Sequence, residues 1–160
     1  MALIGGGNTA ITEALYLSEI CKKVYILVRG KEFKAETVWI DQIVKHSNIE
    51  VQFETSVVSI EGSLSVEKLL LNTGKELAVD GVFVAIGNEP NTTIVDSLHV
   101  EKDSAGYIIV NAHQQTNIPR LYAAGDITTG SNKFQQTIMS AAEGCLAAHS
   151  IHEDFLKNAL

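Results

Sequence analysis

The stretch ALIGGGNTAITEALYLSEICKKVYILV, residues 2–28, decides the fold of this chain. It opens with the apolar run Ala2–Ile4 and continues at once into the glycine-rich run Gly5–Ala10. Apolar residues then recur at helical spacing as far as Leu17, and a second apolar run covers Val24–Val28. The order of strand, glycine turn, helix and strand predicts a β-α-β unit, the building block of a parallel sheet.

The glycine turn has the spacing of a dinucleotide-binding fingerprint, Gly5-x-Gly7-x-x-Ala10, in the form that ends in alanine. The first glycine permits the tight bend, the second lets the backbone approach a diphosphate, and the third position must be small for packing. N–H groups at the start of the following helix then face the phosphate oxygens. We therefore expect a diphosphate at six residues, with a purely structural turn as the alternative: Gly5, Gly6, Gly7, Asn8, Thr9 and Ala10.

The residues after the second strand indicate which dinucleotide is bound. A carboxylate about 20 residues past the glycines would bind the ribose of NAD, but Val28 and Arg29 occupy that place. Arg29, Lys31 and Lys34 instead form a basic turn, which suits the 2′-phosphate of NADP(H). The turn therefore predicts NADP(H) rather than NAD(H), with a solvated basic surface as the alternative.

The remaining part of the N-terminal segment predicts a small α/β domain. Residues 35–46 predict a helix whose apolar side carries Val38, Trp39, Ile43 and Val44. Residues 49–53 predict a strand, and residues 56–79 predict short antiparallel strands with a turn at 72–75.

An apolar strand over residues 82–87 closes this domain, and Asn88–Asn91 breaks the chain after it. Folds of this type bind ligands beyond the carboxyl ends of their strands. We therefore expect Ile86 and Gly87 to lie near the nucleotide, although a plain domain-exit turn is a compatible interpretation.

The C-terminal segment has a different pattern. Short strands are predicted at 106–110 and 121–124, and the second of them ends in Gly125-Asp126. Residues 136–150 predict a helix rich in small residues, and 151–156 either continue it or form a short final helix.

Composition excludes several classes of function. The 160 residues include 12 Lys+Arg and 19 Asp+Glu, a formal net charge of −7. This balance disfavours general binding to nucleic acid or to an anionic membrane, and no apolar run reaches the roughly 18 residues of a membrane span. Cys21 and Cys145 lie far apart and show no metal-ligand spacing. We therefore expect a cytoplasmic protein with structural thiols and no metal site.

Five strings taken together resemble the low-molecular-weight thioredoxin reductases. The likeness covers nearly the whole chain in order, and the last string also resembles the alkyl hydroperoxide reductase flavoproteins. The strings are GGGNTAITEALYL (5–17), RGKEFKA (29–35), DGVFVAIGNEPN (80–91), PRLYAAGD (119–126) and KFQQTIMSAAEGCLAA (133–148).

The resemblance implies a Rossmann-like NADPH-binding domain at residues 1–90, and the C-terminal part of an FAD-binding domain at residues 91–160. It implies that Asp126 of the Gly125-Asp126 pair holds a ribityl hydroxyl of FAD, and that the next helix faces the flavin at Gln135, Gln136 and Thr137. The implied activity is that of a thioredoxin-disulfide reductase, in which electrons pass from NADPH through FAD to a disulfide, with a thioredoxin-like protein as partner.

The chain departs from the family pattern in three ways. Val28-Arg29-Gly30 keeps one arginine of a His-Arg-Arg type string, and we expect Lys31 and Lys34 to compensate for the missing charge. A second Gly-x-Gly and a Cys-x-x-Cys are both absent from the sequence. We therefore expect the C-terminal portion of a longer reductase, with an incomplete FAD-type lobe and no activity alone.

Two other functions are weighed against this hypothesis. One is a non-catalytic NADP(H)-binding module or a subunit of a split reductase. The other is a complete NAD(P)-dependent dehydrogenase, which the lack of any recognisable catalytic arrangement of His, Lys or Tyr disfavours.

An uncovered apolar lobe beyond residue 90 would drive association, so we expect the chain to form a homodimer, swap this lobe, or dock it on the NADP(H) domain.

Overall fold

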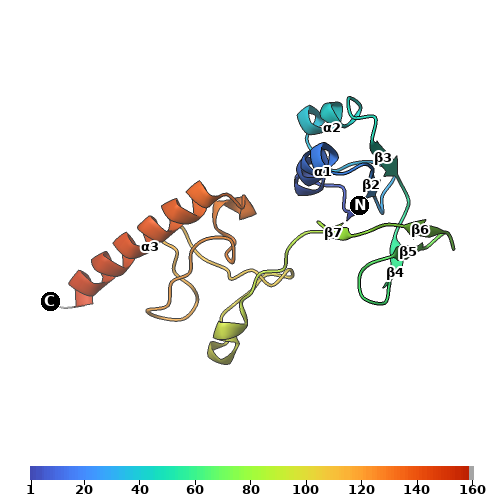
Figure 1. Ribbon diagram of the computed structural model, residues 1–160. Coiled ribbons are helices and arrows are strands. Elements are labelled where there is room, and N and C mark those ends of the chain that lie inside the picture. The colour runs from blue at the N-terminus through green and yellow to red at the C-terminus, as the bar shows by residue number, and fades with distance from the viewer. Residues whose placement is uncertain (159–160) are drawn as a thin grey trace. The chain divides into compact units, whose positions relative to one another are not determined.

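A computed structural model describes residues 1–158 of the chain. The chain divides into two compact units, Met1–Gly87 and Asn88–Leu160, whose elements are shown in Figure 1.

The first unit is built on a four-stranded parallel sheet. Its strands are β1 (Ala2–Ile4), β2 (Val24–Leu27), β3 (Ile49–Gln52) and β7 (Val82–Val84), in the order β3-β2-β1-β7. Because all four strands are parallel, their carboxyl ends meet at one edge of the sheet. The glycine turn begins at this edge, directly after β1.

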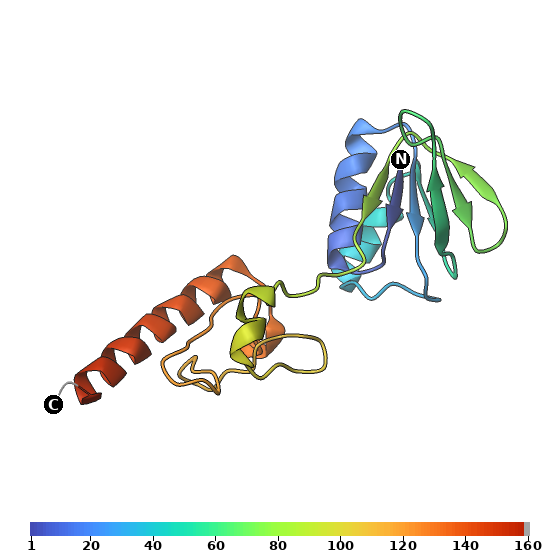
Figure 2. The ribbon, with the colours of Figure 1, turned by 90° about the horizontal axis from the view of Figure 1, so that it is seen from below.

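Two helices, α1 (Asn8–Ile20) and α2 (Thr37–Ile43), cover one face of this sheet, as Figure 2 shows. Alternate strand residues such as Leu3 and Ile26 are fully buried against Ile11 and Ala14 of α1. The amphipathic spacing that predicts α1 therefore places its apolar side on the sheet.

The opposite face is covered by the antiparallel strands β4 (Val57–Glu61), β5 (Lys68–Leu71) and β6 (Glu76–Ala78) (Figure 2). Leu69 and Leu71 pack there with Ala2 and Leu27, which point away from the helices. The predicted turn at residues 72–75 joins β5 to β6, and Gly74 adopts a φ of +77° within it. The α/β fold with a small antiparallel layer is confirmed.

The predicted apolar side of the second helix is wrong in part. Ile43 is buried, but Val38 and Trp39 are exposed, and Ile40 is the half-buried neighbour of Ile43 one turn earlier. The helix ends at Ile43, so the exposed Val44 lies beyond it. The shorter helix turns only its 40/43 side towards the core.

In the second unit, the predicted strands at 106–110 and 121–124 do not form. Residues 88–158 show only isolated bridges, Lys102↔Ile108, Ile108↔Thr128 and Gln115↔Tyr122. The segments that flank these bridges turn at Asp103 and Asn111, so no ladder extends beyond a single pair. Apolar content predicted these segments, whereas a strand also needs a continuous partner.

The second unit contains the 3-10 helices η1 (Thr93–Leu98) and η2 (Gly130–Lys133) and the long helix α3 (Thr137–Asn158). Residues 151–156 therefore continue α3. Its buried side carries Glu143, Ala147 and Ser150. Across residues 1–158, no helix combines the length and the apolarity that crossing a membrane requires.

Candidate functional site

The glycine turn is shaped by close contacts at its first two positions. Gly5 has a φ of +149°, and a Cβ there would collide with the carbonyl oxygen of Ala85 just after β7. A Cβ at Gly6 would lie 2.9 Å from Cγ1 of Val28. Ala10 is fully buried, and its Cβ would lie 3.1 Å from a Cβ at Gly5. The sheet itself therefore requires small residues at these positions.

Gly7 differs from its neighbours. A Cβ at Gly7 would meet no atom of the described part of the chain within 4 Å. Its φ of −94° and ψ of −177° are open to any residue. Neither conformation nor packing explains this glycine, so the space beside it is available to a ligand.

Unpaired backbone donors line the same turn. Helix α1 begins at Asn8 without a side-chain cap, and its first internal bond runs from the N–H of Ile11 to the carbonyl oxygen of Gly7. The N–H groups from Gly6 to Ala10 donate to no acceptor among residues 1–158. Such donors at a helix start, aided by the helix dipole, suit a phosphate group.

The structure fastens the basic turn to the glycine turn. The N–H of Lys34 donates to the carbonyl oxygen of Gly6 at 2.7 Å. The side chain of Asn8 donates to Oε1 of Glu36 at 3.0 Å and accepts from the backbone N–H of Glu36 at 2.8 Å. These bonds hold Lys34 and Glu36, which follow the basic turn, beside the start of α1.

The three cations of the basic turn are available for a ligand. Arg29, Lys31 and Lys34 are exposed. The ion pairs found among residues 1–158 involve other lysines. The structure thus brings three positive charges to the edge where the free N–H groups lie.

The predicted residues at the end of β7 reach the same edge. The N–H of Ala85 donates to the carbonyl oxygen of Ile4 at 2.8 Å, which extends the contact between β7 and β1. Ile86 follows with 73% of its side chain exposed, and Gly87 has a φ of +109°. Both residues therefore lie beyond the carboxyl ends of the paired strands β1 and β7. They directly follow Ala85, whose carbonyl oxygen packs against Gly5.

A second glycine turn, in residues 88–158, carries Asp126. The hydroxyl of Ser140 on α3 donates to Oδ1 of Asp126 at 2.8 Å. The other carboxylate oxygen, Oδ2, has no hydrogen-bond partner within the described part of this unit. The exposed Asp126 can therefore accept a hydrogen bond from a ligand hydroxyl.

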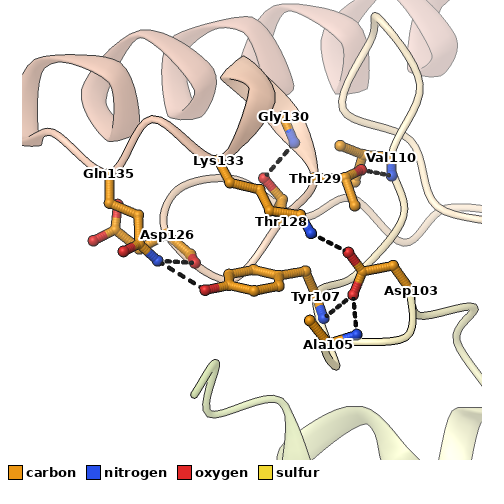
Figure 3. Close-up of polar contacts among 10 residues, drawn as sticks. All are labelled: Asp103, Ala105, Tyr107, Val110, Asp126, Thr128, Thr129, Gly130, Lys133 and Gln135. Carbon is orange, nitrogen blue, oxygen red and sulfur yellow. Dashed lines mark hydrogen bonds and ion pairs between the residues drawn. The ribbon is translucent and has the colours of Figure 1, made fainter. Parts of the chain in front are cut away.

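Gln135 lies between Asp126 and Tyr107, as Figure 3 shows. Its side-chain nitrogen donates to the Tyr107 hydroxyl at 3.2 Å and lies 3.4 Å from the carbonyl oxygen of Asp126. Gln136 and Thr137 are exposed at the start of α3, and the N–H groups of residues 135–138 donate to no described residue. The structure thus brings Asp126 and Gln135 together, and Gln136 and Thr137 follow Gln135 at the exposed start of α3.

Two contacts of Lys133 hold the segment before Gln135, and we call them the Lys133 latch. Lys133 forms an ion pair with Asp103, and its Nζ lies 4.7 Å from the centre of the Tyr107 ring (Figure 3). The bond to Lys133 lowers the pKa of the Asp103 carboxyl, as do the backbone N–H groups of Tyr107 and Ala105, whereas burial opposes this. Lys133 also ends a run of three non-glycine residues in the left-handed region, a conformation that costs about 1–3 kcal/mol per residue.

Sequence reasoning missed two parts of these sites. Glu143, with 6% of its surface exposed, accepts from the backbone N–H of Gly125 at 2.8 Å. Glu36 pairs with Asn8 across a sequence separation of 28 residues. A glutamate among small residues of a helix gives no indication in the sequence that it is buried. The contact between Asn8 and Glu36 joins residues far apart in the chain, so no local pattern predicts it.

Residues 1–144 match the family of pyridine nucleotide-disulphide oxidoreductases. The thioredoxin reductase of Buchnera aphidicola subsp. Schizaphis graminum is 40% identical over 164 residues, which cover 92% of this chain and 50% of that protein. Thioredoxin reductase 2, mitochondrial, of Saccharomyces cerevisiae is 37% identical, with 92% of this chain and 44% of that protein covered.

Solved structures give the same result. The thioredoxin reductase of Lactococcus lactis matches with a TM-score of 0.87 and 28% identity over 98% of this chain and 52% of that one. The thioredoxin reductase of T. acidophilum matches with a TM-score of 0.83 and 34% identity over 97% and 52%. The chain spans about half the length of these relatives. The chain belongs to the pyridine nucleotide-disulphide oxidoreductase family, and the resemblance to thioredoxin reductases expected from its sequence is confirmed.

Proposed function

We propose that this chain supplies the NADP(H) site and part of the FAD site of a thioredoxin reductase-like enzyme. FAD, which Asp126 and Gln135 would help to hold, would supply the redox chemistry that links NADPH to the disulfide of a thioredoxin-like partner. Residues 1–160 contain no Cys-x-x-Cys, so the proposal assigns them cofactor binding and no dithiol step.

One observation carries the proposal. Gly7 borders open space, and the N–H groups from Gly6 to Ala10 donate no hydrogen bond to any of the described residues 1–158. A diphosphate explains both facts, because its oxygens accept such donors and its bulk needs the room that glycine leaves.

The nucleotide's adenosine end is assigned to the basic turn. Arg29, Lys31 and Lys34 would hold the 2′-phosphate through charge-assisted hydrogen bonds. Their turn is tied to the phosphate-binding turn through Lys34, Asn8 and Glu36. Ile86 and Gly87 would border the nucleotide at the end of β7.

The flavin contacts are assigned to the second unit. Asp126 would accept a ribityl hydroxyl at Oδ2, the oxygen that Ser140 leaves free. Gln135, Gln136 and Thr137 would offer donors to the ring at the start of α3, where the backbone N–H groups of 135–138 donate to no residue among 1–158. These residues orient the cofactor and do not exchange electrons themselves.

Calorimetry on the full chain tests the nucleotide assignment. NADPH should bind more tightly than NADH, and replacing Arg29, Lys31 and Lys34 together by Gln should remove that preference. Loss of one charge-assisted bond costs about 1.5–3 kcal/mol, roughly a tenfold to hundredfold change in Kd. Replacing Lys22, Lys45 and Lys75 by Gln is the matched control, since these exposed lysines lie outside the basic turn. Equal affinities of the wild-type chain for NADPH and NADH would refute the assignment.

A non-catalytic NADP(H)-binding module is the second candidate. The observation that favours it is that residues 1–160 contain no Cys-x-x-Cys, because their only cysteines, Cys21 and Cys145, lie far apart in the sequence. An absorbance spectrum separates the two candidates. A flavin band that NADPH bleaches supports the reductase, whereas a colourless chain that still binds NADPH supports the module.

We also propose that the chain associates through its second unit. Helix α3 is buried on one side, while several of its large apolar side chains remain exposed: Ile138, Leu146, Ile151, Phe155 and Leu156. Large apolar side chains left exposed to water favour association with another surface. Size-exclusion chromatography with light scattering should give the mass of a dimer. A monomer mass at every protein concentration tested would contradict this.

A further inference from the structure

A buried carboxylate lies beneath the turn that carries Asp126. Glu143 is on the buried side of α3, with 6% of its surface exposed. No lysine, arginine or histidine of residues 1–158 forms an ion pair with it. Burying a carboxylate is costly unless hydrogen bonds replace its water, so the contacts of Glu143 indicate why it is there.

Two donors converge on one oxygen of this carboxylate. The backbone N–H of Gly125 donates to Oε2 at 2.8 Å, and the hydroxyl of Thr128 lies 3.1 Å from the same oxygen. The Thr128 hydroxyl is also 3.0 Å from the carbonyl oxygen of Gly125. A carboxylate is the stronger acceptor of the two, so Glu143 holds the hydroxyl as well as the N–H.

Gly130, in the same loop as Gly125 and Thr128, also packs against the Glu143 carboxylate. The N–H of Gly130 donates to the Thr128 hydroxyl oxygen at 3.1 Å, a bond drawn in Figure 3. A Cβ at Gly130 would lie 2.6 Å from Oε1 of Glu143. The loop therefore fits over the carboxylate because residue 130 is glycine.

We propose that Glu143 is a positioning residue for Asp126. It fastens Gly125 on one side of Asp126 and Thr128 on the other, so the backbone that presents the Asp126 carboxylate is held from below. This role rests on the proposed function, in which Asp126 accepts a flavin hydroxyl, and it adds a residue that does not itself touch the cofactor.

The first test compares variants of the full chain by hydrogen exchange over residues 125–130. Glu143→Leu keeps the bulk but removes the acceptor, and it should raise exchange of the Gly125 amide at least tenfold. Glu143→Gln keeps one acceptor oxygen and should raise it less than threefold. Ala147→Gly, on the same buried side of α3, controls for general weakening of the helix and should leave residues 125–130 unchanged.

A second pair of variants keeps the proposal testable if Glu143→Leu fails to fold. Thr128→Val removes the hydroxyl and should raise exchange over residues 125–130, whereas Thr128→Ser restores the wild-type rate. Unchanged exchange in both Glu143→Leu and Thr128→Val, or equal exchange in Thr128→Val and Thr128→Ser, would overturn the proposal.

FAD titration supplies the second readout, by quenching of flavin fluorescence. Glu143→Leu should weaken FAD at least tenfold relative to Ala147→Gly, and Glu143→Gln should stay within threefold of the wild-type chain. If the wild-type chain binds no FAD, the proposed function fails, and the exchange data still decide whether Glu143 holds the turn. Wild-type affinity in Glu143→Leu would overturn its role towards Asp126.

Discussion

The two units build the same kind of feature by different means. Each carries a glycine-containing turn that follows an apolar segment and precedes a helix: Gly5–Gly7 before α1, and residues 125–136 before α3. In the first, strand ladders and two apolar clusters fix the turn, and close packing requires glycine. In the second, a buried carboxylate and a few hydroxyl and amide groups do so.

This difference teaches where each site is vulnerable. A turn held by packing is sensitive to added volume and tolerant of changes in charge. A turn held by polar contacts is sensitive to the loss of one donor or acceptor and, through Asp103, to acid. The experiments below test this contrast, in order of decreasing expected effect.

The largest effect is expected at Gly5. In Gly5→Ala the new Cβ collides with the Ala85 carbonyl while the residue keeps a positive φ, so the free energy of unfolding should fall by roughly 3 kcal/mol or more. Trp39 is the single tryptophan and lies on α2. Its fluorescence during urea unfolding of the full chain therefore reports on the first unit.

Gly74→Ala is the matched control for this change. Gly74 also has a positive φ, of +77°, but a Cβ there meets open space. Only the conformational cost remains, about 1–2 kcal/mol. Equal losses in Gly5→Ala and Gly74→Ala would show that the contact with β7 does not hold the glycine turn.

A smaller effect is expected at Asn8. Asn8→Ala removes both bonds to Glu36 and should lower the free energy of unfolding by about 1 kcal/mol. Because the basic turn loses one attachment, the Kd for NADPH measured by calorimetry should rise several-fold. A change of this size in Kd corresponds to about 1 kcal/mol of binding free energy. Gln42→Ala, which removes a surface bond to Lys45, is the control. An NADPH affinity that survives Asn8→Ala unchanged would show that this attachment plays no part in binding.

The smallest effect concerns acid sensitivity in the second unit. The bond to Lys133 lowers the pKa of Asp103, below the unfolded value of about 3.9. The carboxylate therefore stabilises the fold above the unfolded pKa, and this contribution is lost as pH falls through the lower, folded pKa. Titration of the Tyr107 amide resonance should show the low midpoint, and Lys133→Met should raise it. A midpoint at or above the ordinary value in the wild-type chain would contradict the latch.

Local patterns predicted the first unit well. The residues that decide it, Gly5 to Ala10 and the apolar runs around them, are adjacent in sequence, so their spacing can be read locally. The same patterns misplaced Val38 and Trp39, because apolar character does not specify which side of a seven-residue helix meets the core.

The second unit was predicted less well for a physical reason. Leu121–Ala124 has the composition of a buried strand, but pairing depends on a partner that the segment itself does not encode. Glu143 is equally hidden, since its burial comes from Gly125 and Thr128 folding over α3. Contacts between distant residues therefore decide the parts that local sequence does not reveal.

Gly7→Ala tests the central claim most directly, because Gly7 is the glycine that the protein itself does not need. NADPH is titrated by calorimetry into the full wild-type chain and into the variant, with urea unfolding measured alongside. The account predicts that the variant keeps its stability and binds NADPH at least tenfold more weakly, since the Cβ occupies space for the diphosphate. Equal NADPH affinity in the two proteins, or no binding by the wild-type chain at saturating NADPH, would contradict it.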